Sequence, residues 1–150
     1  MSIFNILSNH PLFAALIAWA IAQIVKVPLE YLQTHNWNWA LLLRAGGMPS
    51  SHSALVSGVT HSIGLYLGFS SPLFALAFIL SMIVIYDATG IRLQAGKHAK
   101  IINRMIIDLA SGHPLKQEEL REVLGHTPLE AITGTILGIL IAQIEWMVMN

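Results

Sequence analysis

Residues 45–86 read AGGMPSSHSALVSGVTHSIGLYLGFSSPLFALAFILSMIVIY and contain no Asp, Glu, Lys or Arg. Residues 1–25 contain none either, and residues 131–150 contain only Glu145. An α-helix rises about 1.5 Å per residue, so about 20 apolar residues span the roughly 30 Å hydrocarbon core of a membrane. The three stretches therefore predict an all-α fold, a polytopic integral membrane helical bundle.

The composition agrees with a membrane location. The chain has 150 residues, of which 55% are hydrophobic and 11% charged, about half the charged fraction of a soluble domain. No linker or repeat divides residues 1–150, so we expect a single membrane-embedded domain. The N-terminus lacks the basic region and cleavage site of a secretory signal, so the first apolar stretch is expected to be a permanent helix. The absence of cysteine excludes disulfides and cysteine catalysis, and the zero formal net charge gives no reason to expect a nucleic-acid partner.

We expect about four transmembrane helices joined by polar connections. Their approximate bounds are residues 10–25, 53–69, 73–86 and 129–147. The first helix is expected to end at Lys26 and Pro28, and Ser70-Ser71-Pro72 to form a turn, because proline disfavours helix continuation. Glu145 lies near the far end of the last helix, where we expect it to reach the membrane interface.

The polar part of the chain runs from residue 87 to residue 128. Residues 99–110 place their apolar side chains on one helical face, which predicts an amphipathic, interfacial helix lying on the membrane or against the other helices. Residues 116–124 predict a second short, charged helix. This segment holds most of the ionisable groups from which a site could be built.

Small residues recur at the spacing that lets membrane helices pack closely. Gly64 and Gly68 form one such pair, and Gly134 and Gly138 form another. Helices in a membrane associate through close packing and hydrogen bonds between them. We therefore expect the second and fourth helices to approach a neighbour closely at these glycines.

All the basic residues fall in the two polar connections that precede the second and fourth helices. They are Lys26, Arg44, Arg92, Lys97, Lys100, Arg104, Lys116 and Arg121. With four spans these connections share one side of the membrane. The positive-inside rule predicts that this side is cytoplasmic and that both termini lie outside.

Four clusters of polar residues are expected to meet at that cytoplasmic face. They are Lys26; Gly46 to His52; Asp87 with Arg92, Lys97 and His98; and Arg121 with His126 and Glu130. A single charged residue at the end of a packed helix is ordinarily an interfacial anchor. The gathering of four clusters on one face instead favours a site that handles phosphate.

Ser50-Ser51-His52 begins the second helix. The start of a helix offers unpaired N–H groups and a positive dipole end, which together suit a phosphate, and the nearby glycines allow close backbone approach. A serine N-cap beside an interfacial histidine explains the same three residues. The segment alone leaves both interpretations open.

The segment LGHTPLE, residues 124–130, begins the fourth helix. Thr127 as N-cap, Pro128 at the first helical position and Glu130 three residues after Thr127 form a capping box. Glu130 could instead orient His126 through a ring N–H and leave the other ring nitrogen free to attack phosphorus. The spacing is compatible with both roles.

Three segments resemble a known family. GMPSSHS (residues 47–53), YDATGIR (residues 86–92) and LGHTPLE (residues 124–130) are similar to the divergent branch of the type 2 phosphatidic acid phosphatase superfamily. That superfamily is related to vanadium-dependent haloperoxidases. The resemblance runs over most of the chain and implies a membrane phosphatase.

The resemblance also implies roles for individual residues. His52 resembles the acid that protonates the leaving group, His126 resembles the nucleophile, and Glu130 replaces the family's aspartate. The chain departs from the main family elsewhere: Ser51 replaces a glycine, Arg121 lies one residue closer to the histidine, and no Lys-x6-Arg-Pro motif is present. Lys26 and Arg92 are the residues that topology offers for the missing lysine and arginine.

The sequence thus predicts a phosphoric ester hydrolase that acts on a lipid phosphate at the cytoplasmic face. His126, oriented by Glu130, forms a phosphohistidine, and His52 serves first as acid and then as base, which predicts a bell-shaped pH profile. The residues expected to hold the phosphoryl oxygens are Lys26, Ser50, Ser51, Arg92 and Arg121. The lysine and the two arginines take the place of a metal, so no cofactor is expected.

The candidate substrates are phosphatidylglycerol phosphate, phosphatidic acid and a prenyl phosphate. Four short spans enclose little volume, so we expect a homodimer among membrane lipids. Two alternatives remain: a protein that binds anionic lipid headgroups without turnover, and a metal-dependent phosphatase using Asp87, Glu130 and histidines. A vanadate-dependent peroxidase is a further relative in chemistry, but nothing in the sequence suggests a halide substrate.

Overall fold

The computed structural model describes residues 8–42, 47–110 and 127–150. Every regular element in these ranges is helical. The elements are α2 (His10–Thr34), the 3₁₀ helix η1 (Trp39–Leu42), α3 (Ser51–Leu67), α4 (Pro72–Thr89), α5 (Ile91–Ala110) and α6 (Pro128–Met149). The predicted all-α membrane fold is confirmed.

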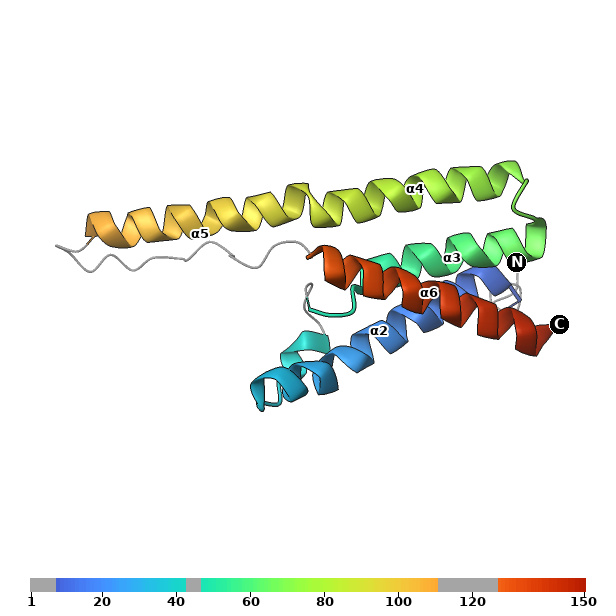
Figure 1. The fold of residues 1–150 in the computed structure, drawn as a ribbon, viewed down its shortest axis with the longest axis horizontal. Helices are drawn as coiled ribbons and strands as arrows, with labels where there is room; N and C mark the ends of the chain where they lie inside the picture. Colours follow the sequence, from blue (N-terminus) through green and yellow to red (C-terminus); the bar gives the residue numbers. More distant parts are fainter. Residues whose placement is uncertain (1–7, 43–46, 111–126) are drawn as a thin grey trace.

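Helix α3 is the centre of the bundle and contacts α2, α4 and α6 (Figure 1). The start of α2, the turn between α3 and α4 and the end of α6 lie at one end, which we call the Glu145 end (Figure 1). The start of α3, the end of α4 and the start of α6 lie at the opposite end, which we call the Ser50 end (Figure 1). The alternating helix directions bring together segments that are far apart in sequence.

Three helical segments are long and apolar enough to cross a membrane: His10–Leu32, Pro72–Thr89 and Pro128–Met149. Helix α3 has 17 residues, which corresponds to roughly 25 Å of helix. It lies between the other three and matches the predicted second span with a shift of two residues. The chain is an integral membrane protein.

The contact between α3 and α6 depends on glycine. A Cβ atom on Gly134 would lie 2.2 Å from the Ser50 carbonyl oxygen, and one on Gly138 would lie 2.3 Å from the Ala54 carbonyl oxygen. No side chain fits at either position, so the predicted close approach at this pair is confirmed. The Ser57 hydroxyl adds a hydrogen bond of 3.1 Å to the Thr135 carbonyl across the same contact.

The other predicted glycine pair serves a different purpose. A Cβ on Gly64 would collide with the ring of Phe69, and Gly68 is the C-cap of α3 with φ +91°. Side chains other than glycine rarely adopt that backbone conformation. These two glycines therefore shape the turn into α4, and the prediction of a helix–helix contact at this pair is wrong.

Helix α2 extends past its predicted end. Pro28 lies inside the helix, which continues to Thr34 and ends at His35 in a left-handed conformation. Membrane helices tolerate an internal proline because neighbouring groups satisfy the freed carbonyl. Lys26 is consequently part of the membrane-spanning helix rather than of a polar connection.

Helix α5 starts at Ile91, eight residues before the predicted amphipathic helix, and continues nearly in line with α4 beyond the bundle (Figure 1). Among the described elements it contacts only α4, so it does not pack against the other helices. Ile101, Met105 and Ile107 are exposed along it. The predicted helix at residues 116–124 lies outside the described residues.

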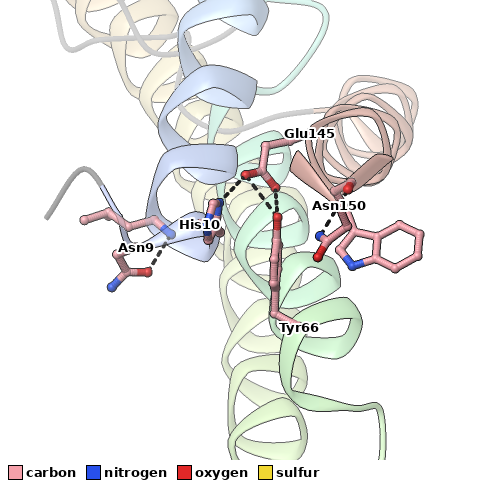
Figure 2. A network of polar contacts seen from close by, with 7 residues as sticks. Asn9, His10, Tyr66, Glu145 and Asn150 are labelled. Atoms are coloured by element: carbon pink, nitrogen blue, oxygen red, sulfur yellow. Dashed lines mark hydrogen bonds and ion pairs between the residues drawn. The ribbon is translucent and has the colours of Figure 1, made fainter. Parts of the chain in front are cut away.

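Glu145 is buried at the end of the bundle named after it (Figure 2). His10 Nδ1 lies 2.8 Å from its Oε1, and the Tyr66 hydroxyl donates to Oε2 at 3.2 Å. The rings of His10 and Tyr66 stack with centroids 4.7 Å apart. Polar groups on α2 and α3 thus offer the carboxylate partners inside the bundle, and the position of Glu145 relative to the membrane interface stays a prediction.

Candidate phosphate-binding site

Lys26 is the buried cation of the Ser50 end. Only 1% of its surface is exposed. Its ammonium donates to Gln23 Oε1 at 2.5 Å and to the Ser51 hydroxyl at 3.2 Å. A charge removed from water needs such partners. The two hydrogen bonds fix the ammonium at the first residue of α3.

Ser50 caps the same helix. Its hydroxyl accepts from the Ser53 backbone N–H at 3.3 Å and from the Ser53 hydroxyl at 3.1 Å, so the N-cap interpretation of Ser50 is confirmed. The Ser50 backbone N–H donates to the Glu130 carbonyl at 2.8 Å. That N–H was expected to hold phosphate and is already engaged, so an anion at this helix start would need other donors.

His52 occupies the second position of α3. Its side chain is exposed, whereas Ser51 before it and Ser53 after it are buried. An exposed imidazole beside a helix start can exchange protons with water or with a bound anion. The position is compatible with the acid role that the resemblance implies.

Glu130 forms the capping box that the sequence predicts. The Thr127 N–H donates to Glu130 Oε2 at 3.2 Å, and the Glu130 N–H donates to Thr127 Oγ1 at 3.3 Å. The Glu130 carboxylate also interacts electrostatically with the Lys26 ammonium. The side chain therefore caps α6 and carries a charge that attracts the Lys26 ammonium.

Gly47 lies next to the side chain of Lys26. Its φ of +79° favours glycine, and a Cβ there would lie 3.8 Å from Cδ of Lys26. The segment that carries the predicted Pro-Ser-x-His pattern thus lies along the stem of the lysine. Local backbone conformation and the path of α2 together position the ammonium.

The structure brings together four of the predicted site residues: Lys26, Ser50, Ser51 and Glu130. His52 belongs to the same helix start. Arg121 and His126 lie outside the described residues, so the position of the expected nucleophile and its relation to Glu130 stay predictions.

The remaining predicted cluster lies at the junction of α4 and α5. Asp87 belongs to the end of α4, and Arg92 to the first turn of α5. His98 is exposed farther along α5. Within residues 8–42, 47–110 and 127–150 no three His, Asp or Glu side chains gather closely enough to hold a metal ion.

Gln23 is the site residue that the sequence analysis missed. It bonds to Lys26 through its carbonyl oxygen and to the Leu42 carbonyl through its amide nitrogen, at 2.9 Å. A polar side chain three residues before a lysine, after a run of apolar residues from position 11 to position 22, was the available signal, because residues at this spacing share one helical face.

An apolar groove lies between α4 and α6 beside this site. Its volume is about 320 Å³, and its lining includes Ile85 and Thr89 of α4 and Ala131, Ile132 and Ile136 of α6. Ala131 directly follows Glu130 in the chain. The groove therefore begins one residue after Glu130 in the sequence, at the start of α6.

The chain is thus a helical membrane protein with a buried lysine at a Pro-Ser-x-His helix start. The chain belongs to the Divergent PAP2 family, whose sequence model matches residues 7–141. It is 39% identical over 151 residues to the uncharacterized membrane protein YuiD of Bacillus subtilis (strain 168), a match covering 93% of this chain and 96% of that protein. No solved structure matches the chain.

Proposed function

We propose that the protein is a lipid phosphate phosphatase that hydrolyses a phosphomonoester or pyrophosphate at the cytoplasmic face. The observation that carries the proposal is the Lys26 ammonium, buried against Ser51 at the start of α3. A buried cation beside a helix N-terminus is an environment that favours a phosphate dianion. Membership of a phosphatase-related family supports the same chemistry.

The phosphoryl oxygens are held by charge and by N–H donors. A lysine ammonium has three donors, and contacts between described residues use two of them. The third donates to phosphate, together with the backbone N–H groups at the start of α3. Arg92 and Arg121 complete the neutralisation of the anion.

Hydrolysis proceeds in two displacements. His126, oriented by Glu130, attacks phosphorus, the bond from phosphorus to the lipid oxygen breaks, and His52 gives its proton to the departing alkoxide. Neutral His52 then takes a proton from water, which attacks the phosphohistidine and releases phosphate and His126. Each histidine returns to its starting state, so no cofactor is consumed.

The groove between α4 and α6 supports a lipid rather than a soluble substrate. Its lining is mostly apolar and belongs to two helices that are long and apolar enough to cross a membrane. One hydrocarbon chain of the substrate occupies it while the headgroup reaches Lys26. Phosphatidylglycerol phosphate, phosphatidic acid and a prenyl phosphate all have this form.

A second candidate is binding of anionic lipid without turnover. The capping box favours it, because one oxygen of Glu130 is already used to begin α6. On this alternative Lys26 and the start of α3 dock a headgroup, and neither histidine reacts. The two candidates differ in whether phosphate is released.

The test is phosphate release from a panel of lipid phosphates by detergent-purified protein, with and without a chelator. We expect release that the chelator does not affect and that His52→Ala and His126→Ala each abolish while remaining folded. Wild-type turnover by both folded variants would reject the site. Abolition by chelator with recovery on added magnesium would select the metal-dependent alternative, and binding without release would select the second candidate.

A further inference from the structure

We infer that Gln23 is a positioning residue that holds the Lys26 ammonium in place for phosphate, an inference that rests on the proposed function. The geometry points to it through two hydrogen bonds of one amide group. Gln23 Oε1 accepts from Lys26 Nζ at 2.5 Å, and Gln23 Nε2 donates to the Leu42 carbonyl at 2.9 Å. The amide joins the end of η1 to the site.

Only one orientation of the amide satisfies both partners. An ammonium has donors and no acceptor, and a carbonyl has acceptors and no donor. A flipped amide would face the NH₂ group towards the ammonium and the oxygen towards the carbonyl, which breaks both bonds. The Leu42 carbonyl therefore fixes the direction of the Gln23 oxygen, and that oxygen fixes the lysine.

Lys26 needs such an anchor because its side chain is a flexible four-carbon stem. Besides Gln23, the ammonium contacts the Ser51 hydroxyl on α3, and the Glu130 carboxylate on α6 attracts it electrostatically. Gln23 is a neutral acceptor, so it holds the ammonium without cancelling its charge. Loss of Gln23 lets the ammonium move towards Glu130, where an ion pair would neutralise the charge that phosphate requires.

The chain offers a matched control in Gln143. This glutamine lies on α6 towards the Glu145 end, and its Oε1 lies 3.1 Å from His61 Nε2. Like Gln23 it is a half-buried amide on a membrane-spanning helix. Gln143→Leu therefore removes the same group without touching the phosphate site.

The experiment is a double-mutant cycle between Gln23→Leu and Lys26→Met in purified protein. Its readouts are the dissociation constant of inorganic phosphate and KM for the lipid phosphate, with thermal unfolding measured alongside. Because hydrogen bonds to charged groups are the strong ones, we expect Gln23→Leu to weaken phosphate binding roughly 10-fold. Adding it to Lys26→Met should cause no further loss, since contacting residues that act through each other are not additive.

Two results would overturn the inference while leaving the proposed function intact. One is a loss of the same size in the wild-type and Lys26→Met backgrounds, which marks a structural effect. The other is phosphate affinity in Gln23→Leu equal to that of Gln143→Leu. A wild-type protein that binds no phosphate and hydrolyses no lipid phosphate would instead reject the proposed function, and the inference with it.

A second variant keeps the test valid if Gln23→Leu does not fold. Gln23→Glu retains an acceptor for Lys26, loses the donor to the Leu42 carbonyl and replaces a neutral partner by a carboxylate. We expect the folded variant to bind phosphate more weakly than the wild type. In the Lys26→Met background, Gln23→Glu should cause no further change in phosphate affinity. Phosphate affinity unchanged by Gln23→Glu would contradict the need for a neutral anchor.

Discussion

At the scale of single residues, Glu130 combines a structural and an electrostatic role. Its carboxylate closes the capping box with Thr127 and acts on the Lys26 ammonium. A glutamine also completes a capping box. Glu130→Gln therefore separates the two roles, because it preserves the cap and removes the charge.

We predict that Glu130→Gln changes the free energy of unfolding by less than about 0.5 kcal/mol. Lipid phosphate turnover should fall roughly 10- to 100-fold, because the carboxylate no longer orients His126. Thr127→Ala is the matched control, since it weakens the cap and keeps the carboxylate. Full turnover in Glu130→Gln would show that Glu130 is only a capping residue.

The pH dependence of turnover tests the pairing of the two histidines. His126 must be neutral to attack, so activity should rise as it loses its proton. His52 must be protonated to assist the leaving group, so activity should fall at higher pH as it loses its proton in turn. We expect a bell-shaped profile in the range where histidines titrate; a fall that occurs only as a lysine deprotonates would contradict it.

At the scale of elements, the packing of α3 against α6 determines how Glu130 is positioned relative to Lys26. The Ser50 N–H bonds to the Glu130 carbonyl, and Gly134 leaves room for the Ser50 carbonyl. Separation of these helices would remove Glu130 from Lys26. Stability and site geometry are therefore coupled through one glycine.

Gly134→Ala should force the two helices apart, because its Cβ would lie 2.2 Å from the Ser50 carbonyl oxygen. We predict a loss of about 1–3 kcal/mol in stability, measured by denaturant or thermal unfolding in detergent. Phosphate affinity should fall with it. Thr133→Ala, at the neighbouring position, is the control, and equal stability of the two variants would contradict the close packing.

Contacts among Glu145, His10 and Tyr66 connect α6, α2 and α3 at the Glu145 end. Glu145→Ala leaves His10 and Tyr66 without their shared partner, and hydrogen bonds between membrane helices contribute up to roughly 2 kcal/mol each. We predict a stability loss of about 1–3 kcal/mol with phosphate affinity unchanged, whereas Met147→Ala on the exposed face should have little effect. A large loss of phosphate affinity in a folded Glu145→Ala protein would contradict the separation of the two ends.

At the scale of the whole molecule, the membrane orientation is testable because the chain has no cysteine. We predict that Asn150→Cys reacts with a membrane-impermeant maleimide from outside intact spheroplasts. Lys100→Cys, on the exposed surface of α5, should react only after lysis. Labelling of Lys100→Cys in intact spheroplasts would reverse the orientation and place the Ser50 end outside.

Local signals predicted the fold, and contacts between helices explain what they missed. The charge-free stretches and the turn at Pro72 are properties of short segments, so the helices were predictable. The close helix contact at Gly134 and Gly138 was predictable for the same reason. The continuation of α2 through Pro28 depends on the membrane environment, and a sequence pattern does not reveal it. Burial of Glu145 and the bond from Gln23 to Lys26 depend on which helix faces meet, and that is set by tertiary packing.

Phosphoryl transfer through His126 is the central step of the proposed mechanism. The most direct measurement is a rapid acid-free quench of purified protein with a radiolabelled lipid phosphate, followed by localisation of protein-bound label. We predict label on His126, stable to base and labile to acid, which His126→Ala eliminates together with phosphate release. Phosphate release by His126→Ala at the wild-type rate, or label on a different side chain, would contradict it.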